Sequence, residues 1–197
     1  MRTAILALLG FSIFGAHAVL ASAAEKESTY EIEAVVFENR LPELVGDEQL
    51  ARNPLLAKIR GLENAVTPDK LEGNSFLQPT ITGLLEQDGH FRVLAHLRWF
   101  QTVDAKSIAK PMRVASANPG ELEGTIRFFM SRHLHLDVNL LFRETVTTSS
   151  KEPAAAIFQM SEQRKVKTLE THYFDHPRLG VLVRVMPVEK DKDKDKK

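Results

Sequence analysis

Cysteine is absent from the 197 residues of the chain. Without a thiol, the chain can form no disulfide, no thiolate metal site, no cysteine nucleophile and no lipidated N-terminal cysteine. An excess of either charge is also absent, since 26 lysine and arginine residues balance 26 aspartate and glutamate residues. A general nucleic-acid-binding protein normally carries a basic excess. We therefore expect a protein that is held together by packing alone and that binds no nucleic acid.

Long hydrophobic runs are missing beyond the N-terminus. Residues 1–24 combine a single charge at Arg2, the apolar stretch Ala4–Phe14 and small residues at 21–23, which is the pattern of a secretory signal peptide. The alternative is a membrane anchor, but the apolar stretch is shorter than the roughly 20 residues that a spanning helix needs. We predict that residues 1–24 are a signal peptide and that the chain does not span a membrane after its cleavage.

The rest of the chain has a body and a tail. Residues 190–197 contain only lysine and aspartate, cannot bury apolar surface and are expected to be disordered. Residues 25–189, about 165 residues, are enough for a single domain with one core. Charge is uneven along this body, because residues 24–88 carry 6 basic and 13 acidic side chains whereas residues 89–189 carry 14 and 10. The second part also contains all six histidines of the body, so we place the binding of an anionic polymer or partner there.

Apolar residues that recur with a period of two predict strands. By this criterion we expect strands at Tyr30–Phe37, Phe91–Val103, Ala156–Ser161, Val166–Tyr173 and Gly180–Val188. The last of these is almost continuously apolar, which is typical of a central strand or one that is covered on both faces.

The longest alternating pattern covers residues 125–143, where the apolar residues keep the same parity throughout. A hairpin with a two-residue loop would swap that parity, so the pattern indicates either one long bent strand or a hairpin with a three-residue loop. No glycine or proline marks a turn between Gly124 and Pro153. We therefore favour a single strand that bends near Ser131-Arg132.

Two short helices are expected in the first half of the body. Asn53-Pro54 resembles a helix N-cap followed by proline at the first helical position, and apolar residues at helical spacing follow it as far as Leu62. A second helix is predicted from Pro79 to Gln87, where Asp88-Gly89 ends it. Together these elements predict an α+β fold: a mostly antiparallel β-sheet with long bent strands and two short helices packed on it, in a single domain.

Histidines raise the possibility of a metal site. His133 and His135 would share one face of a strand about 6.5–7 Å apart, which lets two imidazoles bind one metal ion. His172, Asp175 and His176 add ligand types that zinc uses. However, no HExxH or other known ligand spacing is present, so we favour a polar sheet face or a ligand-contact role and expect no metal. There is also no Gly-x-Ser-x-Gly motif for a serine nucleophile.

Two further clusters have both a structural and a functional interpretation. The basic run Arg164–Lys167 is either an edge strand that its charges protect from aggregation or a contact with an anionic polymer or acidic partner. The segment His172–Pro177 is dense in groups that stack on sugar rings or hydrogen-bond to them. Its alternative interpretation is a tight turn before the last strand.

Four segments carry a resemblance to a known family: Tyr30–Phe37, Val93–Gln101, Leu122–Ile126 together with Arg132–Leu136, and Glu162–Val183. The combination of His-Leu-His-Leu with His-Tyr-Phe-Asp-His-Pro resembles the CsiV family of periplasmic peptidoglycan-binding proteins. The family pattern before the second motif is Arg-Arg-Met-Arg-Ser, but this chain has lysine at positions 165 and 167. Lysine does not reproduce the planar fork of arginine, so these two positions do not offer a pair of parallel hydrogen bonds.

The resemblance implies a non-enzymatic periplasmic protein without a cofactor. It would bind peptidoglycan and support an outer-membrane lipoprotein that activates a penicillin-binding protein. From their chemistry we expect eight residues to contact the ligand, because rings and polar groups suit a glycan and cations suit the carboxylates of the peptide stems. These are Trp99, His133, His135, Arg164, His172, Tyr173, Asp175 and His176. Two alternatives stay open: a metal-dependent envelope hydrolase that uses His133, His135, His172 and His176, or an envelope scaffold that contacts only proteins.

Overall fold

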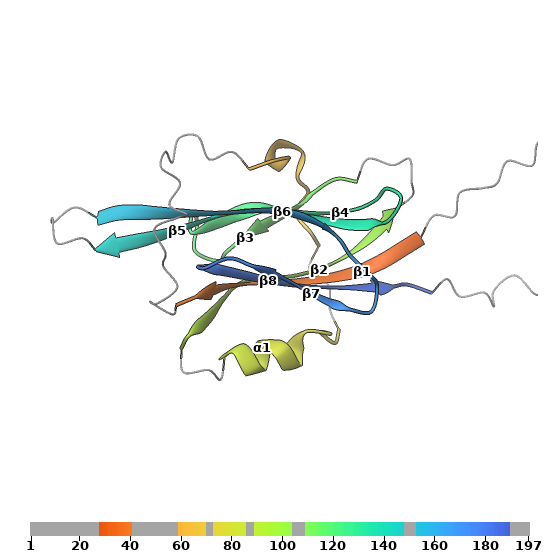
Figure 1. The fold of residues 1–197 in the computed structure, drawn as a ribbon, viewed down its shortest axis with the longest axis horizontal. Coiled ribbons are helices and arrows are strands. Elements are labelled where there is room, and N and C mark those ends of the chain that lie inside the picture. The colour runs from red at the N-terminus through yellow and green to blue at the C-terminus, as the bar shows by residue number, and fades with distance from the viewer. Residues whose placement is uncertain are drawn as a thin grey trace, which may run out of the picture.

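Two four-stranded antiparallel sheets packed face to face form the body of the protein (Figure 1). The computed structural model describes residues 28–40, 59–69, 73–85, 89–103, 109–147 and 153–189. Sheet A has the strand order β2 (Phe91–Val103), β1 (Ser28–Asn39), β8 (Leu179–Pro187) and β7 (Thr171–Asp175). Sheet B has the order β3 (Met112–Ala115), β4 (Leu122–Met130), β5 (Leu134–Thr147) and β6 (Pro153–Lys165).

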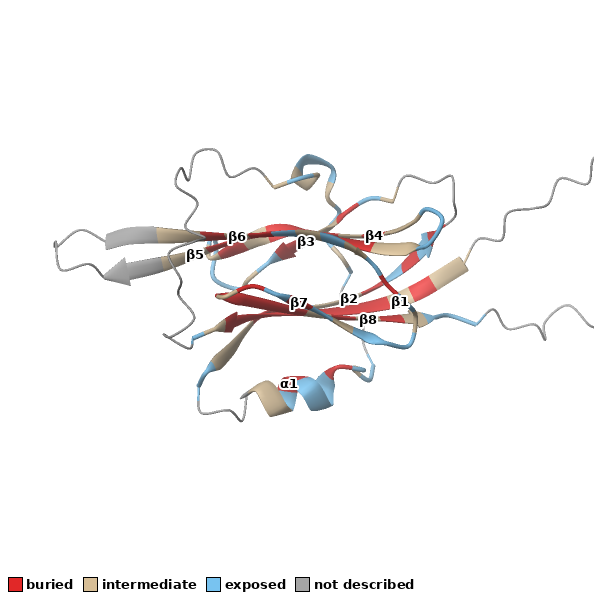
Figure 2. Ribbon diagram, viewed as in Figure 1, coloured by how far each residue is buried: buried red, intermediate tan, exposed pale blue. Residues whose placement is uncertain are grey.

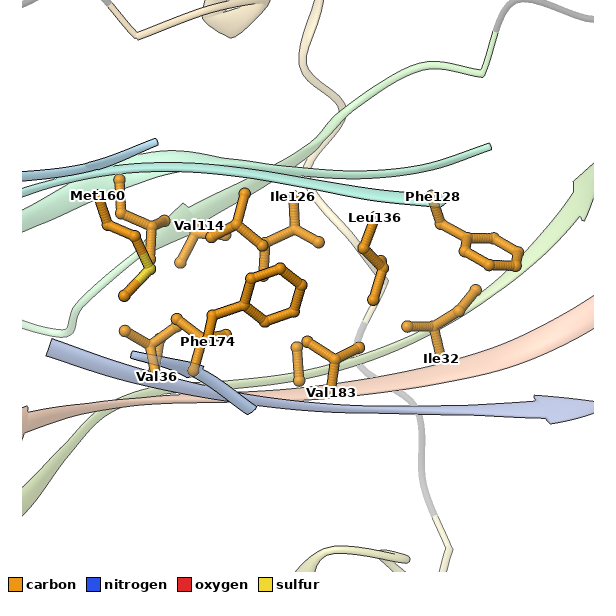
Figure 3. Packing of buried hydrophobic residues seen from close by; sticks show 14 of the residues in the cluster. Ile32, Val36, Val114, Ile126, Phe128, Leu136, Met160, Phe174 and Val183 are labelled. Atoms are coloured by element: carbon orange, nitrogen blue, oxygen red, sulfur yellow. The ribbon is translucent and has the colours of Figure 1, made fainter. Parts of the chain in front are cut away.

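The main core lies between the two sheets (Figure 3). Successive side chains of a strand point to opposite faces, so the alternating apolar residues of both sheets meet in the middle. Ile32 and Val183 of sheet A and Ile126 and Leu136 of sheet B are fully buried there. Phe174 of β7 lies among them and is also fully buried.

Sheet A is also covered on its outer face. The helix α1 (Gln78–Leu85) lies on the side of sheet A that faces away from sheet B (Figure 2). Leu77 and Ile81 are four residues apart and pack on Val35 and Leu182 of the sheet. This second cover explains the almost continuously apolar sequence of β8, which the structure places between β1 and β7.

A three-residue loop joins β4 and β5, so the prediction of one long bent strand over residues 125–143 was wrong. Met130 pairs with Leu134 and Phe128 with Leu136, and residues 131–133 form the loop. A loop with an odd number of residues preserves the parity of the apolar positions, as the alternative interpretation required. None of the loop residues has a positive φ, which is why neither glycine nor proline marks the turn.

The remaining fold predictions are confirmed in part. The structure is mostly antiparallel β-structure, with strands over 30–37, 91–103 and 180–187 as expected. The predicted Val166–Tyr173 strand is confirmed only from Thr171, where β7 begins, because residues 166–170 form the connection after β6, in which Leu169 has a φ of 66°. The described residues form two four-stranded sheets instead of the one expected sheet, and each sheet buries an apolar face against the other.

Only one of the two predicted helices can be assessed. The predicted Pro79–Gln87 helix corresponds to α1, whereas most of the helix expected from Asn53-Pro54 lies outside the described residues. Beyond that point, Leu62–Asn64 form a short 3-10 turn, η4. The predicted signal peptide 1–24 and the tail 190–197 also lie outside the described residues. Among the residues that are described, no helix has the length and apolar character needed to cross a membrane.

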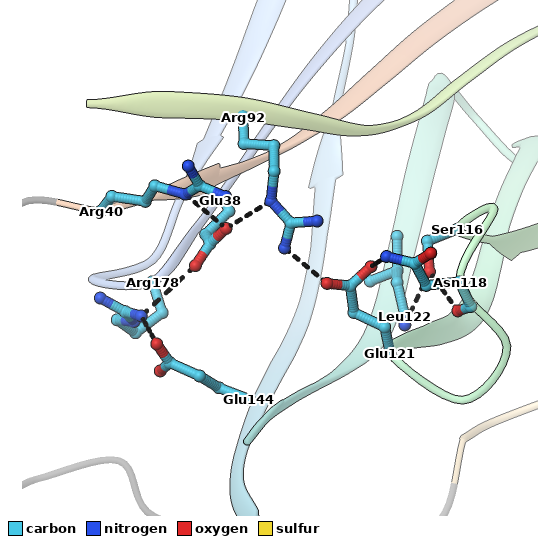
Figure 4. A network of polar contacts seen from close by, with 9 residues as sticks. All are labelled: Glu38, Arg40, Arg92, Ser116, Asn118, Glu121, Leu122, Glu144 and Arg178. Atoms are coloured by element: carbon cyan, nitrogen blue, oxygen red, sulfur yellow. Dashed lines mark hydrogen bonds and ion pairs between the residues drawn. The ribbon is translucent and has the colours of Figure 1, made fainter. Parts of the chain in front are cut away.

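A polar network fastens the two sheets together at one end of the sandwich (Figure 4). Glu38 of β1 is its centre, since its carboxylate pairs with Arg40, Arg92 and Arg178. Arg92 of sheet A continues to Glu121 beside β4, and Arg178 continues to Glu144 of β5. Both arginines therefore link one sheet to the other.

Gly180 offers a test of the packing on the outer face of sheet A. A Cβ atom at this position would lie 2.1 Å from the Phe37 ring, and that ring is itself in contact with Phe91 and Tyr173. We expect Gly180→Ala to lower the free energy of unfolding by about 1–3 kcal/mol in urea denaturation. Gly83→Ala is the matched control, because an added Cβ in α1 meets no atom within 4 Å. Equal stability of the two variants would contradict the close packing of Gly180.

Candidate binding site

Two of the eight predicted site residues lie in the interior. Trp99 is 3% exposed, and its indole N–H donates to Gln101, which in turn donates to the Phe128 carbonyl of the other sheet. His176 is also buried and accepts a hydrogen bond from the Arg178 amide on Nδ1. Burial lowers the pKa of His176, against an opposing effect of Asp175, and so favours the neutral ring. These two side chains stabilise the fold and are not displayed to a ligand at the surface.

Four more predicted residues lie along the edges of β6 and β7. Arg164 links the two sheets, because it donates to the Tyr173 carbonyl at 2.8 Å and its guanidinium lies over the Phe174 ring. Nε2 of His172 lies 2.9 Å from the Lys167 carbonyl and so supports the turn between the strands. Tyr173 is 46% exposed and donates to Asp175 at 2.7 Å. Burial, followed by this hydrogen bond, raises the pKa of Tyr173 to about 12, so the hydroxyl stays protonated at neutral pH.

His133 and His135 lie at the β4–β5 hairpin. His133 is exposed in the loop, and its carbonyl oxygen accepts a hydrogen bond from Nδ1 of His135 at 2.8 Å. The His135 ring stacks on Phe129 of β4 with a centroid distance of 5.2 Å and an interplanar angle of 17°. The His135–Phe129 pair lies on the outer face of sheet B. The sequence neighbours of these two residues, Phe128 and Leu136, point into the core, and successive side chains of a strand point to opposite faces.

The four histidines that could have formed a metal site do not come together. His133 and His135 belong to the hairpin of sheet B, His172 to the start of β7, and His176 follows the end of β7. In the described part of the chain, no group of three or more histidine, aspartate and glutamate side chains is placed to hold a metal ion.

A cavity of about 470 Å³ lies on the outer face of sheet B, next to the His135–Phe129 pair. We call it the sheet-B cavity. It lies between the sheet and two segments, residues 60–64 and 109–111, and its volume is in the range of small-ligand sites. Its lining consists of Arg60, Gly61, Asn64, Ala109, Lys110, Pro111, Thr125, Arg127 and Asp137.

Backbone and side-chain contacts hold the wall of this cavity on the sheet. The Thr125 hydroxyl donates to the Arg60 carbonyl at 2.9 Å. Val66 forms a short parallel bridge with Met112, in which its amide donates to the Pro111 carbonyl at 2.9 Å and its carbonyl accepts from the Arg113 amide. The segment that carries Arg60 is therefore attached to sheet B at both ends.

The sheet-B cavity has more positive than negative groups. Asp137 is buried and accepts from Arg60 on one oxygen at 3.1 Å and from Arg127 on the other at 3.0 Å. Lys110 is exposed at the rim and has no carboxylate partner among the described residues. Among the described lining residues, three cations and a single carboxylate leave an excess of two positive charges, which suits an anionic group.

Arg127 connects the cavity to the aromatic pair. Its guanidinium carbon lies 4.8 Å from the centre of the Phe129 ring, and the side chain is also one of those that line the sheet-B cavity. His135, Phe129 and Arg127 thus form a continuous strip that leads into the cavity. We call this strip, the cavity and His133, whose carbonyl accepts a hydrogen bond from His135, together the sheet-B surface.

A larger cavity of about 630 Å³ lies between the edge strands β2 and β3. Its three basic side chains already have acidic partners: Arg98 pairs with Glu31, Arg113 with Glu123, and His96 contacts Glu33. The sheet-B cavity is therefore the better candidate for an anion, because Lys110 lacks such a partner in the described structure.

A comparison with protein-family models matches residues 77–188 to a family described as CsiV, peptidoglycan-binding protein. The match covers more than half of the chain. The chain belongs to the CsiV family. Searches of curated proteins and of solved structures found no match.

The CsiV match includes much of the sheet-B surface. Lys110, Arg127, Phe129, His135 and Asp137 lie within the matched range, whereas Arg60 and Asn64 precede it. Three of the four segments that carry the resemblance to CsiV also lie within the range, and Tyr30–Phe37 precedes it. Recognition of the family from these segments is thus confirmed.

Sequence reasoning found only His133 and His135 at this surface. It missed Arg60, Lys110, Arg127, Phe129 and Asp137. Odd-numbered positions hold Arg127, Phe129, His135 and Asp137. Because a hairpin with a three-residue loop preserves parity, their shared parity was a signal that all four side chains lie on one face of the sheet. No comparable signal exists for Arg60, because 77 residues separate it from Asp137.

Proposed function

We propose that this CsiV-family chain is a non-enzymatic, periplasmic accessory protein of cell-wall synthesis that binds peptidoglycan through the sheet-B surface. The family match over residues 77–188 carries the proposal of peptidoglycan binding. The surface supports it, since stacked rings suit sugars and cations suit the carboxylates of peptide stems. By the resemblance to CsiV, its partner would be an outer-membrane lipoprotein that activates a penicillin-binding protein. The proposed domain is residues 25–189, after removal of residues 1–24.

The eight predicted contact residues contribute unequally to this proposal. His135 belongs to the stacked pair, and His133 orients it through its carbonyl. A second polar surface lies along β6 and β7, the edge strands of sheets B and A, and contains Arg164, His172, Tyr173 and Asp175. No observation favours the metal-dependent hydrolase, because its four histidines are dispersed.

Co-sedimentation with purified sacculi tests the proposed function. We expect the protein to sediment with intact sacculi over a range of salt concentrations and to release no soluble fragments from them. Phe129→Ala removes the ring that lies between His135 and Arg127, and we expect it to weaken binding about three- to tenfold, as for the loss of one aromatic contact.

Phe100→Ala is the matched control, because Phe100 is 55% exposed but belongs to β2 of sheet A. It should bind sacculi like the unmodified protein. If the unmodified protein stays in the supernatant at every salt concentration, peptidoglycan binding is refuted. If both variants lose binding equally, the sheet-B surface is not the site.

A further inference from the structure

We infer that the sheet-B cavity binds a free carboxylate of a peptidoglycan peptide stem, and that Lys110 is the residue that makes binding depend on this charge. This inference rests on the proposed function, since it assigns one chemical group of peptidoglycan to one part of the sheet-B surface. Glycan strands are decorated with short peptides, and these peptides carry the carboxylates to which cations can bind.

The arginines of the cavity are held in place before a ligand arrives. Asp137 fixes Arg60 and Arg127 with one carboxylate oxygen each, and Arg60 also donates to Ser161 at 3.0 Å. A guanidinium has five N–H donors. In all of these contacts only Nη2 of each arginine donates, so other N–H groups of both side chains stay available to a ligand. A carboxylate that accepts from preorganised donors loses less entropy on binding.

Lys110 differs from both arginines. It is exposed at the rim, and none of the described carboxylates pairs with it. Asp137 already offsets the charge of one of the two arginines, so the second arginine and Lys110 supply the excess of positive charge. Because Lys110 has no ion pair to lose among the described residues, its substitution tests ligand binding without breaking the contacts of Asp137.

The position of the cavity suits a ligand that has both a sugar and an acidic peptide. Arg127 lies over the Phe129 ring and also lines the cavity. A sugar ring on the His135–Phe129 pair would therefore leave its attached peptide within reach of Arg127 and Lys110. Neither a neutral glycan nor a simple anion would use both halves of the surface.

Isothermal titration with three soluble fragments tests the inference. The fragments are a disaccharide with a peptide stem, the same fragment with its stem carboxylates amidated, and the disaccharide without a stem. We expect the unmodified protein to bind the free acid about tenfold more tightly than the amidated fragment, as for the loss of a charge-assisted contact. Lys110→Gln should remove most of that difference, and Lys110→Arg should restore it.

Arg113→Gln is the matched control for charge. It removes one positive charge from an exposed residue of β3 in the same sheet, outside the sheet-B cavity. We expect it to keep the preference for the free acid. Equal affinity of the unmodified protein for the free and amidated fragments would overturn the inference, as would an unchanged preference in Lys110→Gln. Binding to sacculi without this preference would refute only the carboxylate site, whereas no binding to sacculi would refute the proposed function as well.

Discussion

Glu38→Ala is expected to lower the free energy of unfolding by about 3–5 kcal/mol, because it removes the shared acidic partner of three arginines. The Glu38 side chain is 6% exposed, and that of Arg178 is 7% exposed. Both charges are therefore largely removed from water and depend on each other. Without Glu38, three clustered guanidinium groups would retain only Glu121 and Glu144 as acidic partners in the described part of the chain.

The position of this network increases the expected effect. Arg92 and Arg178 belong to segments of sheet A, and they reach Glu121 beside β4 and Glu144 of β5 at 2.5 Å. Glu38 holds both arginines in the orientation that these contacts need. Its loss should therefore weaken the attachment of the two sheets at this end, in addition to leaving charges unpaired. Nε of Arg178 has no partner in the described structure, so this nitrogen contributes no further hydrogen bond that could compensate.

Urea denaturation at neutral pH measures the effect. Glu123→Ala is the matched control, since it removes one carboxylate from a single, more exposed ion pair with Arg113 and should cost no more than about 1 kcal/mol. Should Glu38→Ala fail to fold, Arg40→Ala tests the same network from its exposed side and should also cost less than about 1 kcal/mol. A loss for Glu38→Ala no larger than that for Glu123→Ala would show that the network does not stabilise the sandwich.

The strands could be read from the sequence because they follow a local rule. The alternation of apolar and polar residues gave β2 its observed bounds, Phe91–Val103, and placed β8 at the centre of a sheet. The connection near residue 131 could not be read in the same way. A bend in one strand and a three-residue loop preserve the same parity, and only the pairing of Phe128 with Leu136 distinguishes them.

The binding surface was harder to predict because its parts are distant in the chain. Arg60 and Asp137 meet only when the segment before β3 folds over the outer face of sheet B. Conversely, Trp99 has a side chain suited to sugars but lies in the core, since residue type does not determine burial. Chemistry alone therefore identified the His133–His135 part of the surface but not the cavity next to it.

Glu33 is a buried charge whose position could not be predicted from the sequence either. On β1 it alternates with apolar residues, a pattern that normally places a carboxylate in solvent. In the structure it is fully buried beneath the start of α1. It accepts hydrogen bonds from the amides of Phe76 at 2.6 Å and Leu77 at 3.1 Å, from the Ser75 hydroxyl and from His96 at 2.6 Å.

These contacts determine how the carboxylate titrates. Burial alone would raise the pKa of Glu33, but the hydrogen bonds from His96, from Ser75 and from the two amides outweigh burial and lower the pKa below its usual value. A lowered pKa means that the unfolded chain takes up this proton at a higher pH than the folded chain does. The stabilisation is therefore complete above the usual pKa of glutamate and is lost as the pH falls through the lowered pKa of the folded protein.

Glu33→Ala should cost about 3 kcal/mol at neutral pH, because four donors lose a charged acceptor. Unfolding free energies of the two proteins, measured from neutral to acidic pH, should converge as the pH falls below the usual pKa of glutamate. Hydrogen exchange should also show faster exchange of the Phe76 and Leu77 amides in the variant, since Glu33 is their acceptor. Glu170→Gln, which removes an exposed carboxylate from a surface pair with Lys167, should follow the unmodified protein at every pH. The free energies of unfolding of Glu33→Ala and the unmodified protein could instead differ by the same amount from neutral to acidic pH. That result would show that the carboxylate does not hold α1 on sheet A through its charge.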